Sequence, residues 1–230
     1  MEQQGPDRRW IVLAVFAVIA IGVVAAVLIS RGGGSDDSSS TSAETGANGC
    51  KKVEAPAPKN VSFKKAKQVL KPGEEATVVM KTSCGTFEIA LDTKRAPKTA
   101  NSFAFLVEEG FYDDLTFHRV VPEFVIQGGD PEGTGTGGPG YKVEEKPPAN
   151  LAYTKGIVAM AKSSAEPPGT SGSQFYVVTA PDAGLPPEYA LVGKVSKGFD
   201  AVERIEKLGG GPEEHPKQTV LIEEATLDRG

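Results

Sequence analysis

Arg119 is the side chain whose type and setting most clearly suggest chemistry. The run 115–121 has the composition of a strand. Successive side chains of a strand point to opposite faces, so Phe117, Arg119 and Val121 would share one face. An arginine between two apolar neighbours is costly to bury unless a partner or a ligand satisfies it. The residues alone leave two interpretations open: an ion pair with a nearby carboxylate, or a guanidinium that faces a ligand.

Other motifs that could carry chemistry fail on their context. The stretch 133–138 matches G-x-G-x-x-G, but Pro139 and Gly140 follow it where a dinucleotide site needs a helix. The chain has two histidines, His118 and His215, and no G-x-S-x-G, which disfavours a Ser/His/Asp triad. Two Cys and two His are too few for a usual structural zinc site. We therefore expect no nucleotide, no metal and no other cofactor.

The composition is that of a globular protein with a distinct N-terminal segment. The 230 residues carry a net charge of −5, so the net charge of the chain does not attract nucleic acid. Ile11–Ile29 is an unbroken apolar run of 19 residues, long enough to span a bilayer. We expect a transmembrane anchor over residues 10–30, with residues 1–9 in the cytoplasm because Arg8 and Arg9 precede the span. A cleaved signal peptide is the alternative, although its apolar region is usually shorter.

Residues 31–75 are expected to be a flexible linker. Its first part is rich in Gly, Ser and acidic residues and cannot bury enough surface to fold. The part over 50–75 contains seven Lys and an Ala-Pro-Ala-Pro stretch, and we read it as a solvated extension of the linker. Cys50 and Cys84 both follow the anchor, where an oxidising compartment would permit a disulfide. A bridge and two free thiols both remain open.

Residues 76–230 predict one domain dominated by short strands. Two helices are expected, one opened by Pro97 and stopped by Gly110, the other starting at Gly198 and ending in Gly209-Gly210-Gly211. The fold class is mainly β, a closed eight-stranded antiparallel barrel capped by two helices. The expected strands are 77–81, 86–91, 115–121, 124–127, 157–161, 174–179, 190–195 and 219–227.

Six stretches of this domain follow the order of one known enzyme family. They are RAPKTANSF at 95–103, FHRVVPEFVIQGGD at 117–130, GTGTGG at 133–138, VAMA at 158–161, GSQFYV at 172–177 and LVGKV at 191–195. Together they resemble the cyclophilin family of peptidyl-prolyl cis-trans isomerases. The resemblance implies a barrel with a substrate groove on its outer face, and an arginine that binds the prolyl nitrogen in the twisted transition state.

The resemblance also implies a role for each residue of the groove. Arg119 matches the catalytic arginine. The positions that form the proline pocket are matched by Phe124, Val125, Tyr176 and Leu185. Those that hold the peptide backbone are matched by Gln127, Ala161, Lys162 and Gln174, and those that border the groove by His118 and Tyr189.

Several positions depart from the best-known eukaryotic pattern. Gly184 stands where an aromatic residue is usual, Val125 where methionine is usual and Lys162 where asparagine is usual. Tyr189 in place of a histidine resembles the bacterial branch of the family. Losing the aromatic side chain removes contact area from the groove.

The resulting hypothesis is a single-pass protein of the cell membrane, whose extracytoplasmic domain isomerises X–Pro bonds in exported proteins. Its partners would be proline-containing segments of those proteins and the membrane, through residues 10–30, with no nucleic acid or nucleotide. The alternative is a catalytically weak peptide-binding chaperone or scaffold that uses the same groove.

Overall fold

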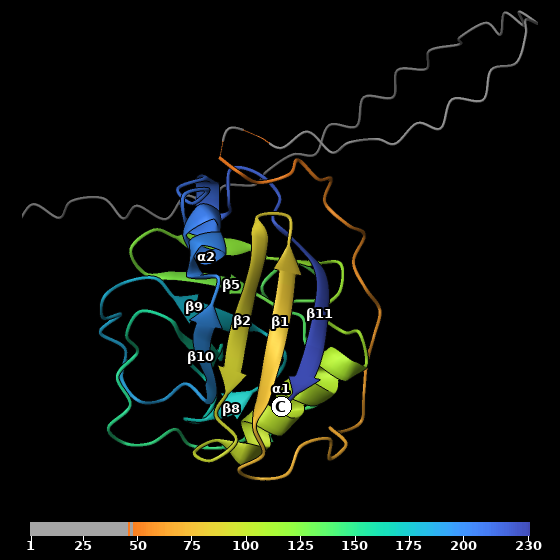
Figure 1. Ribbon diagram of the computed structural model, residues 1–230, viewed down its shortest axis with the longest axis vertical. Coiled ribbons are helices and arrows are strands. Elements are labelled where there is room, and N and C mark those ends of the chain that lie inside the picture. The colour runs from red at the N-terminus through yellow and green to blue at the C-terminus, as the bar shows by residue number, and fades with distance from the viewer. Residues whose placement is uncertain (1–45, 47) are drawn as a thin grey trace, which may run out of the picture. The chain divides into compact units, whose positions relative to one another are not determined.

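A curled antiparallel sheet of nine strands forms the body of the protein in a computed structural model, which describes residue 46 and residues 48–230 (Figure 1). The strands follow the order β3-β11-β1-β2-β10-β7-β9-β5-β4. Their bounds, in that order, are Leu115–Thr116, Leu221–Arg229, Ala76–Thr82, Gly85–Leu91, Leu191–Lys197, Ile157–Met160, Phe175–Val178, Val125–Gly128 and Arg119–Val121.

The sheet differs from the closed eight-stranded barrel that we expected. The predicted strand 115–121 is divided into β3 and β4, and these two pieces are the opposite edges of the sheet. Only Phe117 and His118 separate them along the chain, so the curl of the sheet brings its two edges near each other. Within the described residues no ladder pairs β3 with β4, and the architecture is a curled half-barrel.

Two helices pack on the sheet as predicted. Helix α1, Pro97–Glu108, begins at a proline, and its residues Thr99–Val107 are all buried. Helix α2, Phe199–Glu206, follows Gly198, which has a left-handed backbone. A 3-10 turn, η1, covers Pro212–Glu214, and a small second sheet pairs β6, Val143–Glu144, with β8, Thr170–Ser171.

The core is built around Phe175 of β9. Its ring lies 5.4 Å from that of Phe103 on α1, 5.6 Å from Tyr112 and 5.8 Å from Phe117, centroid to centroid, all edge to face. Such arrangements stabilise a core beyond the area that they bury. Because side chains alternate along a strand, Tyr176 of β9 must point to the opposite face from Phe175.

The register of pairing aligns the outward-facing residues of four strands, β4, β5, β9 and β7. Arg119 pairs with Gln127, Gln127 with Tyr176, and Tyr176 with Ala159. These four residues form one row across β4, β5, β9 and β7 on the outer face. Their strand neighbours point into the main core, which contains Val120, Ile126, Val158, Met160, Phe175 and Val177.

Residues 51–70, here called the strap, run along the domain and differ from the expected solvated extension (Figure 1). Phe63 packs edge to face on Phe105 of α1 with 5.2 Å between centroids, and Leu70 is buried. The buried side chain of Asn101 accepts hydrogen bonds from the N–H groups of Val69 and Leu70, at 2.8 and 3.0 Å, and donates to the carbonyl of Lys67. The strap is therefore part of the folded domain.

A disulfide joins Cys50, just before the strap, to Cys84 in the β1–β2 turn, and both residues are fully buried. Their Cα atoms are 4.1 Å apart. Arg204 of α2 donates from Nε to the Cys84 carbonyl at 2.7 Å, which fixes the turn from its other side.

The described residues contain no helix long and apolar enough to cross a bilayer. The predicted anchor at 10–30, the N-terminus 1–9 and the linker residues 31–45 lie outside the described residues.

We expect the Cys50→Ser/Cys84→Ser variant to lose about 3–4 kcal/mol of unfolding free energy, because the bridge closes a long loop with a sequence separation of 34. Urea denaturation of the full chain measures this. The control is wild type with and without reductant, which should reproduce the difference. A loss below about 0.5 kcal/mol would show that strap packing alone holds the segment.

Candidate functional site

The outer face of β4, β5, β7 and β9 contains a hollow of about 220 Å³ beside Arg119. Apolar and aromatic side chains form its walls, and a guanidinium, an amide and an ammonium group are its polar members. It is lined by Arg119, Phe124, Val125, Gln127, Ala161, Lys162, Tyr176, Leu185 and Tyr189.

Three tyrosines support the wall of this hollow. Tyr189 lies 5.7 Å from Tyr176 and 5.9 Å from Tyr153, centroid to centroid, edge to face in both cases. The hydroxyl of buried Tyr153 donates to the carbonyl of Tyr189 at 2.6 Å and accepts from its N–H at 2.9 Å. Burial raises the pKa of Tyr153 to about 12, so its hydroxyl remains a donor at neutral pH. Sequence reasoning did not single out Tyr153.

Arg119 is held from two sides. Its Nε donates to Glu214 Oε2 from the end of η1, and its Nη1 donates to Gln127 Oε1 at 3.3 Å. The guanidinium also lies 5.8 Å from the centre of the Phe124 ring. An arginine has five N–H donors, so the two that are used leave three without a partner among the described residues.

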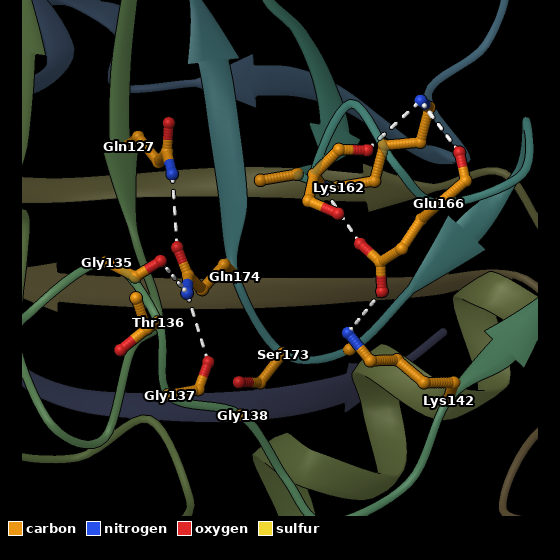
Figure 2. A pocket seen from close by; sticks show the side chains of 13 residues that line it. Gln127, Gly135, Thr136, Gly137, Gly138, Lys142, Lys162, Glu166, Ser173 and Gln174 are labelled. Atoms are coloured by element: carbon orange, nitrogen blue, oxygen red, sulfur yellow. Dashed lines mark hydrogen bonds and ion pairs between the residues drawn. The ribbon is translucent and has the colours of Figure 1, made fainter.

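A chain of amide hydrogen bonds continues from Arg119 across the sheet. Gln127 Nε2 donates to Gln174 Oε1 at 3.1 Å, and Gln174 Nε2 donates to the carbonyls of Gly135 and Gly137 at 2.9 and 3.0 Å (Figure 2). An arginine can only donate and a carbonyl can only accept, so the ends of this chain fix the orientation of both amides. The oxygen of Gln127 must therefore face Arg119.

A second hollow of about 400 Å³ adjoins the first and shares Gln127, Ala161 and Lys162 with it. Figure 2 shows Gln174 and the glycine-rich loop on one side and the Lys142–Glu166 ion pair, 2.7 Å long, on the other. The hydrogen bond from Lys142 lowers the pKa of the Glu166 carboxyl. Because the Lys162 side chain is nearly fully buried, at 4% exposed, it forms a fixed wall where the two hollows meet.

The structure brings together most of the residues singled out from the sequence. Nine of them line the first hollow, as given above, and Gln174 lines the second. No three His, Cys, Asp or Glu side chains within the described range gather as a ligand set for a metal ion.

His118 differs from its expected place at the groove border. It is 8% exposed and lines neither hollow. It lies between β3 and β4, and the preceding Phe117 is buried in the main core, so the expected alternation that would place Phe117 on the face of Arg119 does not hold there. Both ring nitrogens are buried and have no hydrogen-bond partner among the described residues. Burial lowers the pKa of its imidazole, against an opposing effect of Asp130.

Glu214 is the contact to Arg119 that sequence reasoning missed. Its distance along the chain from Arg119 hides the contact, and the acidic pair before His215 was the one available signal. The sequence also does not predict that Lys142 and Glu166 pair beside the second hollow, because each reads as an ordinary surface charge.

Comparisons with known proteins agree with this geometry. The family model described as "Cyclophilin type peptidyl-prolyl cis-trans isomerase/CLD" matches residues 77–227. "Peptidyl-prolyl cis-trans isomerase-like 1" of Gibberella zeae is 40% identical over 65% of this chain and 93% of its own length. "Peptidyl-prolyl cis-trans isomerase CYP18-2" of Arabidopsis thaliana is 35% identical over 65% and 92%.

Two crystal structures of a Cryptosporidium parvum cyclophilin type peptidyl-prolyl cis-trans isomerase match with a TM-score of 0.62. They are 31% and 30% identical and cover 68% and 67% of this chain and 99% of their own. One of them was determined in the presence of the dipeptide Ala-Pro.

These comparisons correct one prediction and leave a second without support. The localisation, a single-pass protein of the cell membrane with an extracytoplasmic domain, is wrong, because the relatives are eukaryotic peptidyl-prolyl isomerases whose names describe no membrane protein. They come from fungi and a plant, so the comparisons do not support the bacterial branch inferred from Tyr189.

Tyr176→Phe should raise the unfolding free energy by about 1 kcal/mol. The Tyr176 hydroxyl is buried without a partner among the described residues, and phenylalanine removes the cost of desolvating it. Chemical denaturation of both proteins measures the change. A destabilisation of similar size would mean that the hydroxyl has a partner in solution, such as a bound water.

His118 should make stability depend on pH. Because burial lowers its pKa in the folded state, the unfolded chain binds the proton more readily. The unfolding free energy should therefore fall once pH drops below about 6.5, the ordinary value, and continue to fall until the lowered pKa is passed. His118→Gln should lose this part of the slope between pH 7.5 and pH 5.5. Equal slopes in the two proteins would contradict the assignment.

Proposed function

The chain belongs to the cyclophilin-type peptidyl-prolyl cis-trans isomerase family, and we propose that Arg119 is the residue with which it accelerates X–Pro isomerisation. The observation that carries this proposal is the position of a partly free guanidinium at the rim of an apolar hollow. The substrates are proline-containing segments of polypeptides, supported by the related structure determined with the dipeptide Ala-Pro.

The reaction explains why these residue types suffice. Amide resonance gives the X–Pro bond a rotation barrier of about 18–20 kcal/mol. Resonance is lost in the twisted transition state, and the prolyl nitrogen gains a basic lone pair. A guanidinium N–H directed at this nitrogen stabilises the twisted state more than either planar state. Arg119 remains charged at any working pH, so the mechanism needs no group with a tuned pKa.

Each wall of the hollow contributes to this step. Phe124, Leu185 and Tyr176 hold the proline ring by apolar contact and exclude water from the guanidinium. Gln127 borders Arg119 and, with the backbone at Ala161 and Lys162, holds the flanking peptide groups. Fixing the ring and the flanking groups leaves rotation about one bond as the remaining freedom.

Arg119→Ala should lower kcat/KM for a short Ala-Pro peptide at least about tenfold, which equals ~1.4 kcal/mol of transition-state stabilisation. Exchange NMR of the cis and trans peptide signals, with the full-length chain, measures this. Arg95→Ala is the matched control, because Arg95 is an exposed arginine paired with Asp92 and lines neither hollow. Peptide binding without turnover by folded wild-type protein would favour the peptide-binding scaffold instead.

A further inference from the structure

We propose that Glu214 is a positioning residue for Arg119, acting from the loop between α2 and β11. This inference rests on the proposed role of Arg119. The loop, residues 207–220, belongs to none of the stretches that carry the family resemblance. It brings a carboxylate to the guanidinium from 95 residues further along the chain.

Glu214 contacts Nε of Arg119, which leaves N–H groups on the terminal nitrogens for the substrate. Glu214 accepts from Nε, whereas Gln127 accepts from Nη1. The three N–H groups that remain lie on the two terminal nitrogens, so a prolyl nitrogen can still be reached by one of them. A carboxylate that masked the site would instead occupy the terminal nitrogens.

Two fixed acceptors define the plane of the guanidinium. Guanidinium is planar, and its donors have a rigid fork geometry. One acceptor would leave the group free to rotate about the contact, but acceptors at Nε and Nη1 together fix its orientation. The long arginine side chain is thus ordered before substrate arrives, which removes an entropy cost from the transition state.

The loop is anchored so that Glu214 meets Arg119. His215 Nδ1 lies 2.8 Å from the carbonyl oxygen of His118. This hydrogen bond ties the residue that follows Glu214 to the residue that precedes Arg119. Lys217 donates its N–H to the Leu208 carbonyl at 2.8 Å and closes the base of the loop. Gly209 allows the close approach, because a Cβ there would lie 2.7 Å from Pro122 Cδ.

The backbone of the loop is held in an unfavourable conformation. Glu213 and Glu214 have φ angles of 53° and 64°, in the left-handed region that non-glycine residues seldom adopt. Such conformations persist only where the surroundings impose them. Here the hydrogen bond of His215 with the His118 carbonyl fixes the chain directly after Glu214, and the Glu214 carboxylate itself accepts from Arg119.

The negative charge of Glu214 only weakly offsets the positive charge of Arg119. The Glu214 side chain is 52% exposed, so solvent screens its field, while the Arg119 side chain is 32% exposed. The carboxylate therefore acts as a hydrogen-bond acceptor of fixed position more than as a neutralising charge. A neutral acceptor of the same length should replace it, and this separates positioning from masking.

The test compares Glu214→Ala, Glu214→Gln and the control Glu213→Ala in the full-length chain, using exchange NMR on an Ala-Pro peptide. We expect Glu214→Ala to lower kcat about tenfold with KM and melting temperature unchanged. Glu214→Gln should stay within a factor of about three of wild type, because its Oε1 can still accept from Nε. Glu213→Ala changes the neighbouring glutamate, which also has a left-handed backbone and, within the described part of the chain, forms no hydrogen bond or ion pair with Arg119.

A second readout separates this inference from the proposed function. The ¹⁵N–¹H signal of Arg119 Nε should be protected from exchange in wild type and in Glu214→Gln, and lost in Glu214→Ala. Adding Glu214→Ala to Arg119→Ala should cause no further loss of kcat, since Glu214 acts through Arg119.

Three results would overturn the inference: unchanged kcat in Glu214→Ala, increased kcat in either Glu214 variant, or an additive loss in the double variant. If Arg119→Ala itself kept full activity, the proposed function would fail, while the Nε signal would still report whether Glu214 orders the side chain.

Discussion

The site depends on one constraint, the two-residue period of strands held in register across β4, β5, β9 and β7. The period forces each of these strands to put one side chain into the aromatic core and the next into the groove. Register then aligns Arg119, Gln127, Tyr176 and Ala159 in a single row. A slip of one residue in any strand would exchange the groove and core residues, so the packing around Phe175 that stabilises the fold also protects the site.

A second constraint on the site is the direction of its hydrogen bonds. The hydrogen bonds run in one direction, from an obligate donor at Arg119 through two amides to obligate acceptors at Gly135 and Gly137. The glycine-rich loop thus contributes carbonyl oxygens, whereas a phosphate-binding loop contributes N–H groups. The hydrogen bonds of Gln174 therefore use the glycine-rich loop in the sense opposite to that of a phosphate-binding loop.

The sequence predicts what local periodicity determines. The longer strands, both helices and the row of groove residues follow from alternation, proline and glycine positions and the family resemblance. Contacts between distant, polar segments could not be predicted in this way. The strap is rich in lysine, which hides the spacing of Val61, Phe63 and Ala66 that packs it against the core. Glu214 meets Arg119 only because a loop folds back on β4, and no local pattern encodes that encounter. Phe117 and His118 lie between two strands and are both buried, so neither strand alternation nor the family position of His118 predicts where these side chains lie.

The bridge between Cys50 and Cys84 also determines how the domain responds to force. It closes a covalent ring that contains the strap and β1, so a pull on the chain ahead of Cys50 passes straight into the β1–β2 turn. The strap carries none of that load, and its packing on α1 is mechanically isolated. Tension would instead reach the middle of the sheet, where β1 and β2 are flanked by β11 and β10. In the strand order, β10 and β7 separate β2 from the groove strands β9, β5 and β4.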